Sequence, residues 1–178
     1  MASIQTHELL NILENLAPLG HSAEWDNTGL LLESHSKKEI QKILLTLDLT
    51  PAVAAEAILK KADWIISYHP PIFSGLKTLS REKPLTAALL DLLKAGISVY
   101  SPHTALDAVE GGVSDWLCEA FPVDEKVCFE GSGRKLSLKK SLTAKEVGEM
   151  IESHIRAPNL RASSPVKNRK IKTLALSP

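Results

Sequence analysis

The fold is decided by the stretch Trp64-Ile65-Ile66-Ser67-Tyr68-His69-Pro70-Pro71, a short apolar run that ends on a Tyr-His pair. The apolar residues predict a buried strand over 64–67. The two prolines forbid further pairing, because proline has no backbone N–H to donate to a sheet. His69 therefore follows directly on a buried strand, in a loop that the prolines make rigid.

Two further strands flank this one along the chain, at 43–49 and 97–100, and each leads into polar side chains. Helical patterns lie between the strands, most clearly over 84–95. This order predicts parallel strands whose carboxyl ends, where ligands bind, lie on one side. The predicted fold class is α/β, with a mixed, mainly parallel sheet flanked by helices. The side chains expected at the binding edge are Asp48, Tyr68, His69, His103 and Asp107. Imidazoles and carboxylates that converge on one edge indicate a metal site.

The last third of the chain has a different pattern, with strand-like pieces at 135–138 and 171–176 around one helix. That helix opens with the capping box Thr143-Ala144-Lys145-Glu146. We expect an α/β domain over residues 1–122 that bears the metal site, and the start of a second α/β subdomain over 123–178. Because nothing follows the strand at 171–176 to cover it, we expect the chain to be the N-terminal portion of a longer protein.

Composition excludes several classes of protein. The 178 residues contain 21 basic and 21 acidic residues, a balance that argues against direct nucleic-acid binding. No apolar run reaches the length of a membrane span, and the N-terminus has no signal-peptide pattern. Two cysteines without close spacing favour a reducing compartment, so we expect a cytoplasmic protein. The tryptophans Trp25, Trp64 and Trp116 are expected in the core.

Each candidate residue has a functional and a structural interpretation. His69 is either a metal ligand or a loop histidine that bonds a backbone carbonyl. His103 and Asp107 are four residues apart, so on a helix they share a face. They either chelate an ion, or the carboxylate orients the imidazole, or they are a helix-terminal carboxylate and a surface histidine. Asp48 either caps the next helix or holds a ligand, and Tyr68 is either a site residue or a half-buried aromatic.

Four segments occur in an order and at a spacing typical of one known family. They are Trp25-Asp26-Asn27-Thr28-Gly29-Leu30, Leu47-Asp48-Leu49-Thr50, Ile65-Ile66-Ser67-Tyr68-His69-Pro70-Pro71-Ile72-Phe73 and His103-Thr104-Ala105-Leu106-Asp107. With these segments the chain resembles the NGG-one-interacting factor three (Nif-three-like) family, many of whose bacterial members are labelled GTP cyclohydrolase type 2.

The resemblance implies an α/β protein with two related, intertwined halves that assembles as a toroidal hexamer. It also implies a dinuclear centre of zinc, iron or another divalent metal. The family's ligand positions match Tyr68, His69 and Asp107, with His103 beside the site. We expect His103 to be the catalytic side chain, either as a proton carrier or as a residue that orients a ligand. Tyr68 stands where the family has a first histidine, as in eukaryotic-type members, and a phenol with a pKa of about 10 is a weaker ligand. The family's later His and Glu ligands have no counterpart in this chain.

The prediction that follows is a Nif-three-like divalent-metal-binding protein that acts as a metal-dependent hydrolase on a nucleotide-like substrate. The alternatives are metal storage or delivery, and a scaffold that binds transcriptional regulators, which would add a nuclear location. The expected partners are further copies of the chain, in a homo-oligomer, and transcriptional regulators, with neither membrane nor nucleic acid. Hydrolysis of the GTP ring rests on the resemblance alone.

Overall fold

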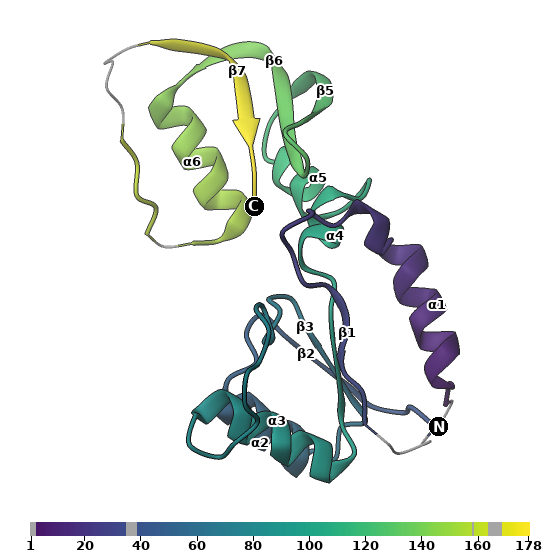
Figure 1. The fold of residues 1–178 in the computed structure, drawn as a ribbon. Coiled ribbons are helices and arrows are strands. Elements are labelled where there is room, and N and C mark those ends of the chain that lie inside the picture. Colours follow the sequence, from purple (N-terminus) through teal and green to yellow (C-terminus); the bar gives the residue numbers. More distant parts are fainter. Residues whose placement is uncertain (1–2, 35–38, 158, 164–168) are drawn as a thin grey trace. The chain divides into compact units, whose positions relative to one another are not determined.

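The computed structural model consists of two α/β units, Met1–Leu106 and Asp107–Pro178, each with its own sheet (Figure 1). It describes residues 3–34, 39–157, 159–163 and 169–178. Within these ranges, none of the helices has the length and apolar character needed to cross a membrane.

The first unit has a four-stranded sheet in the order β1-β4-β3-β2. β2, β3 and β4 are parallel and β1 is antiparallel to β4, which confirms the predicted mixed, mainly parallel sheet. The strands are β1 (Gly29–Leu32), β2 (Ile43–Thr46), β3 (Trp64–Ser67) and β4 (Ser98–Ser101). The helices are α1 (Thr6–Leu16), the 3-10 helix η1 (Leu19–His21), α2 (Pro51–Leu59), α3 (Pro84–Ala95) and α4 (His103–Ala108), the last of which runs into the second unit.

Local sequence sets where these helices begin and end. α2 begins at Thr50, whose side chain accepts a hydrogen bond from the Val53 N–H at 3.2 Å. Pro51 follows in the first helical position, where a missing N–H costs nothing. α3 ends at Gly96, whose φ of +77° is a left-handed conformation that glycine adopts without steric strain. The chain then enters β4 at once. Because β2, β3 and β4 pair in parallel, their carboxyl ends lie at a common edge of the sheet.

Alternate residues of the strands pack on opposite faces of the first sheet. Ile65 and Val99 are fully buried on the face that α2 and α3 cover, together with Leu89 of α3. Trp64 and Tyr100 point to the other face and pack with Leu9 of α1. Trp64 is therefore a core residue, as predicted.

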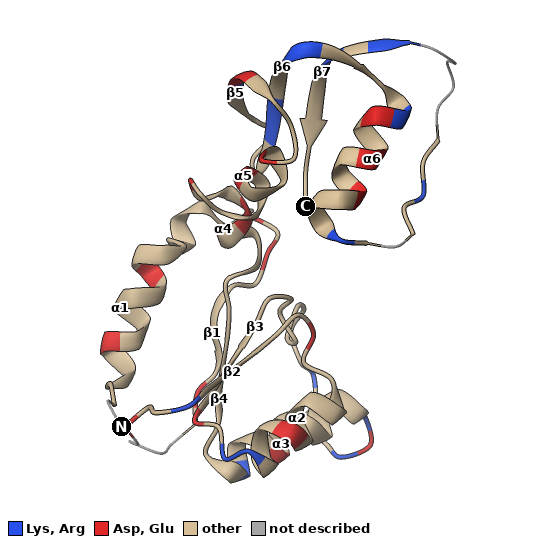
Figure 2. Ribbon diagram, turned by 180° about the vertical axis from the view of Figure 1, so that it is seen from behind, with Lys and Arg blue, Asp and Glu red and all other residues tan. Residues whose placement is uncertain are grey.

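The second unit is a three-stranded antiparallel sheet in the order β5-β6-β7, with two helices. Its elements are α5 (Val113–Cys118), β5 (Val123–Phe129), β6 (Gly133–Thr143), α6 (Ala144–Ile155) and β7 (Lys170–Leu176). Thr143 and Glu146 form the predicted capping box at the start of α6. Cys118 and Phe121 pack with Leu136 of β6, so the boundary expected after residue 122 lies inside this unit. Figure 2 shows acidic residues along α6 and basic residues on β6.

Candidate functional site

The first unit brings several of the predicted side chains together at the carboxyl end of its parallel strands. Tyr68 and His69 follow β3, and His103 follows β4. The His69 and His103 rings have centroids 5.6 Å apart, and the Tyr68 ring lies 4.9 Å from His69 and 5.6 Å from His103. Three side chains from two strand ends therefore form one cluster, as the topology predicts.

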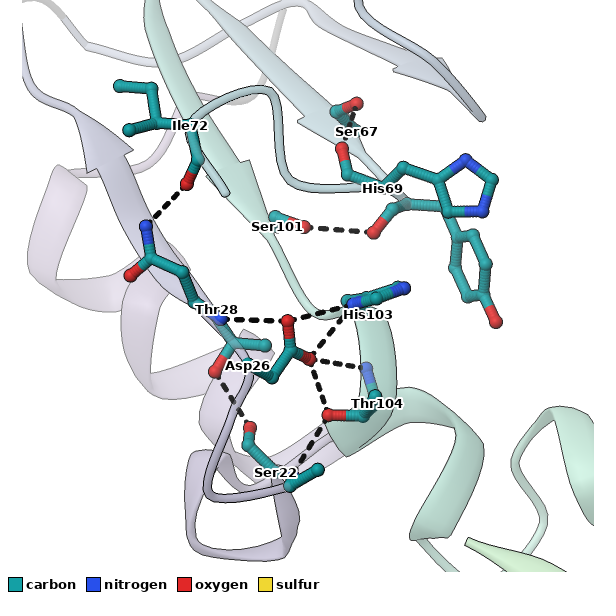
Figure 3. A network of polar contacts seen from close by, with 12 residues as sticks. Ser22, Asp26, Thr28, Ser67, His69, Ile72, Ser101, His103 and Thr104 are labelled. Atoms are coloured by element: carbon teal, nitrogen blue, oxygen red, sulfur yellow. Dashed lines mark hydrogen bonds and ion pairs between the residues drawn. The ribbon is translucent and has the colours of Figure 1, made fainter. Parts of the chain in front are cut away.

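Buried serines hold the backbone beneath the Tyr-His pair. Ser67 donates a hydrogen bond to the His69 carbonyl at 2.8 Å, and Ser101 donates one to the Tyr68 carbonyl at 2.9 Å (Figure 3). Both serine residues are 0% exposed. The backbone that presents His69 is therefore fixed by β3 and by its neighbour β4, and not by the prolines alone.

His69 is oriented by Asp48, which follows β2. The His69 Nδ1 and an Asp48 carboxylate oxygen are 2.8 Å apart. The predicted capping role of Asp48 is wrong, because the side chain of Thr50 caps α2. The two side chains are 48% and 67% exposed, so this pair contributes little to stability. Its effect is to leave Nε2 of His69 as the ring nitrogen open to a ligand.

A second carboxylate–histidine pair, Asp26–His103, lies in the same cluster and is buried. The His103 Nδ1 is 2.9 Å from both carboxylate oxygens of Asp26. The side chain of Asp26 is 0% exposed and that of His103 is 18% exposed. Since a carboxylate can only accept, we assign the proton to Nδ1, which leaves the lone pair on Nε2 of His103.

Further hydrogen bonds fix the Asp26 carboxylate. The Thr104 hydroxyl donates to it at 2.5 Å and the Thr104 N–H, in the first turn of α4, at 3.2 Å (Figure 3). The Asn27 N–H donates to its other oxygen at 2.7 Å. Burial alone would raise the pKa of Asp26, but the hydrogen bonds from Thr104 and His103 outweigh it, so the pKa lies below its ordinary value. Asp26 is therefore held as a carboxylate.

The backbone of His103 is strained in this arrangement. Its φ is +29°, a conformation that residues other than glycine seldom adopt. Such strain costs about 1–3 kcal/mol and concentrates at functional sites, where the surroundings hold it in place. The contact with Asp26 is one such constraint, which supports a functional role for the placement of this ring.

Asp26 was not among the residues predicted for the site. It precedes β1, which is antiparallel to β4, and so it does not follow any of the parallel strand ends. The available signal was the segment Trp25-Asp26-Asn27-Thr28-Gly29, a polar turn before an apolar run. Since β1 pairs with β4, the residues before β1 lie beside those that follow β4.

Asp107 follows His103 by one helical turn in α4 and is 6% exposed. It is the first residue of the second unit, and its sharing of an ion with His69 stays a prediction. In the part of the chain that the structure describes, no group of three or more His, Cys, Asp and Glu side chains is arranged to hold a metal ion.

The expectation that all three tryptophans lie in the core is wrong for two of them. Trp25 is 65% exposed and Trp116 is 43% exposed. Trp25 instead belongs to the site, because its ring centroid lies 6.3 Å from that of His103. It immediately precedes Asp26, whose hydrogen bonds hold this turn against α4.

Comparison with known proteins places the chain among NIF3-like proteins. A family model described as Duf34/NIF3 (NGG1p interacting factor 3) matches residues 4–178. The chain is 42% identical over 153 residues to NIF3-like protein 1 of Drosophila melanogaster, covering 81% of this chain and 52% of the relative. It is 33% identical over 181 residues to the GTP cyclohydrolase 1 type 2 homolog of Clostridium perfringens, covering 97% of this chain and 68% of the relative.

A solved structure supports the fold. A Bacillus cereus protein related to NIF3 matches with a TM-score of 0.84 at 18% identity, covering 99% of this chain and 77% of that one. The chain spans about half the length of the Drosophila relative. Because the family model matches nearly all of its residues, the chain belongs to the Duf34/NIF3 family.

Proposed function

We propose that this chain binds a divalent metal ion and that the whole protein is a metal-dependent hydrolase of a nucleotide-like substrate. The observation that carries the proposal is a pair of imidazoles, His69 and His103, whose ring centroids are 5.6 Å apart and whose Nδ1 atoms each contact a carboxylate. Carboxylates in this position orient metal-binding and proton-transferring histidines. The name of the Clostridium perfringens relative, GTP cyclohydrolase 1 type 2 homolog, supports a nucleotide as the substrate class.

His103 is assigned the proton transfer. With Nδ1–H held by Asp26, its Nε2 can take a proton from a water and return it to the leaving group. The buried carboxylate of Asp26 stabilises the imidazolium that forms in between. The strained backbone of His103 keeps the ring in this position.

His69 is assigned to the metal, through Nε2, with Asp107 and Tyr68 as oxygen donors. These donors fit zinc or iron in kind, since both metals accept imidazole nitrogen and carboxylate oxygen. When bound, the metal would lower the pKa of a water and polarise a substrate oxygen. Three protein donors leave a position for water on a four-coordinate ion. A second ion would need ligands beyond these three.

Metal-dependent turnover tests the hydrolase directly. Protein loaded separately with Zn²⁺, Fe²⁺ or Mn²⁺ is incubated with a panel of nucleotides, and product is measured by chromatography. We expect turnover that a chelator abolishes and one of the metals restores. Loaded protein that consumes no nucleotide with any metal would contradict the hydrolase.

Metal delivery is the second candidate, because His69 and Asp48 are 48% and 67% exposed and a site this open can exchange its ion. The same loaded samples decide between the two functions. Transfer of the ion to a metal-free acceptor protein, without turnover of any nucleotide, would favour delivery.

Replacing Tyr68 with histidine is expected to raise metal occupancy. An imidazole is largely neutral at pH 7, whereas a phenol with a pKa of about 10 must lose a proton to bind well. Elemental analysis of the purified Tyr68→His variant and the wild type gives the ratio of metal to chain. Leu59→His, which adds an imidazole at an 82% exposed position of α2 in the same unit, is the control and should change little. Equal occupancy in Tyr68→His and wild type would contradict the assignment of Tyr68 as a weak ligand.

A further inference from the structure

One large aromatic side chain, Trp25, lies exposed beside the Asp26–His103 pair, and a second, Phe73, lies beside Trp25. Trp25 is 65% exposed and Phe73 is 53% exposed. Their ring centroids are 6.1 Å apart with an interplanar angle of 50°, and the Trp25 ring is edge-on to His103 at 78°. Exposed aromatic rings retain apolar area that a ligand can bury. Their position next to a polar site therefore indicates that they contact a ligand of that site.

Aromatic residues are scarce in this chain, and three of them lie at this edge. The sequence has three Trp, two Tyr and three Phe, of which Trp25 and Tyr68 contact the histidines and Phe73 contacts Trp25. Exposed apolar residues on β2 and just after it, Leu45 and Leu47, are aliphatic. The exposed rings of Trp25 and Phe73 are flat and match a planar ligand in shape.

The two aromatic residues are held in place by a contact between the segments that carry them. The side-chain amide of Asn27 donates a hydrogen bond to the Ile72 carbonyl at 2.5 Å (Figure 3). Asn27 is two residues after Trp25, and Ile72 directly precedes Phe73. A surface ordered before binding loses less conformational entropy when a ligand arrives.

We propose that Trp25 and Phe73 form a stacking platform for the planar heteroaromatic ring of the substrate, an inference that rests on the proposed function and specifies how it recognises its ligand. The ring stacks on Trp25 or Phe73, and its edge faces the Nε2 side of His103. The platform binds through the face of the ring, so it accepts different purines and does not require a phosphate.

Equilibrium dialysis with guanosine and adenosine tests the platform, with ribose 5-phosphate as the probe that lacks a planar ring. We expect both nucleosides to bind saturably and ribose 5-phosphate not to bind. Trp25→Leu and Phe73→Leu should each weaken nucleoside binding by about tenfold or more. Trp25→Phe, which keeps a flat ring, should retain most of the affinity, and Trp116→Leu in the second unit should behave as wild type.

Equal affinity of guanosine for wild type and Trp25→Leu, or no saturable nucleoside binding, would overturn the platform. This outcome is separable from failure of the proposed function, because dialysis requires neither turnover nor metal. Nucleoside binding without any metal-dependent turnover would overturn only the hydrolase. Turnover with unchanged KM in both leucine variants would overturn only the platform.

Discussion

The Asp26→Asn variant is expected to lose most of the turnover proposed here, by about 100-fold or more in kcat. An amide cannot accept from His103 Nδ1, Thr104 and the Asn27 N–H as the carboxylate does, because one of its two polar atoms is a donor. The imidazole would lose its fixed tautomer and its stabilising charge. Steady-state kinetics on the nucleotide identified in the panel give the change in kcat.

The matched control for Asp26→Asn is Asp48→Asn, since both carboxylates contact the Nδ1 of a histidine. Asp48 is 67% exposed, so its replacement should leave stability nearly unchanged and should lower metal affinity more than kcat. If Asp26→Asn turned over at the wild-type rate, the Asp26–His103 pair would have no part in proton transfer.

The same residue predicts how stability depends on pH. The folded pKa of Asp26 lies below its ordinary value of 3.8, so the folded state favours the charged form. Its contribution to stability is therefore complete above the ordinary pKa and is lost as pH falls through the lowered folded pKa. Thermal unfolding of wild type should show this loss on acidification below about pH 4, and Asp26→Asn should lack that part of it.

Replacing Arg134 with methionine is expected to destabilise the second unit by about 3–5 kcal/mol. The Arg134 side chain is 4% exposed and donates to Asp115 at 2.6 Å. It also donates to the Ala108 carbonyl at 2.9 Å, which ties β6 to the end of α4. Removing it leaves the Ala108 carbonyl without this donor, and it leaves Lys126, at 3.0 Å, as the cation beside the buried Asp115 carboxylate. Hydrogen exchange of the β6 amides should be faster in this variant than in wild type, because opening of the second unit then costs less free energy.

The control for Arg134 is Arg81→Met. Arg81 bonds Asp91 at 2.7 Å, but the two side chains are 60% and 44% exposed, so solvent replaces the lost contact. Protection of the α3 amides should stay as in wild type. Wild-type protection of β6 in the Arg134→Met variant would show that the buried pair does not stabilise this unit.

The parallel part of the fold follows from sequence because its signals are local. Proline after Thr50, the apolar run from Trp64 and glycine after Ala95 each set an element boundary within a few residues. The strand ends then follow from right-handed crossovers, which brings Tyr68, His69 and His103 together.

The missed part of the site depends on pairing between distant segments. Asp26 reaches His103 because β1 joins β4 in an antiparallel pair, and no local pattern encodes that partner. Trp25 was expected in the core because large apolar residues usually are buried, yet it is exposed beside His103. Long-range strand pairing and the exposure of an aromatic residue are thus the reasons why Asp26 and Trp25 could not be predicted as site residues.

The central claim is that His69 binds a divalent metal. It is tested most directly by calorimetric titration of metal-free wild type, His69→Ala and His21→Ala with Zn²⁺. His21 is exposed in η1 of the same unit and controls for the loss of any surface imidazole. We predict saturable binding to wild type and to His21→Ala, and loss of that binding in His69→Ala with an unchanged circular dichroism spectrum. Equal Zn²⁺ affinity and stoichiometry in all three proteins would contradict the account.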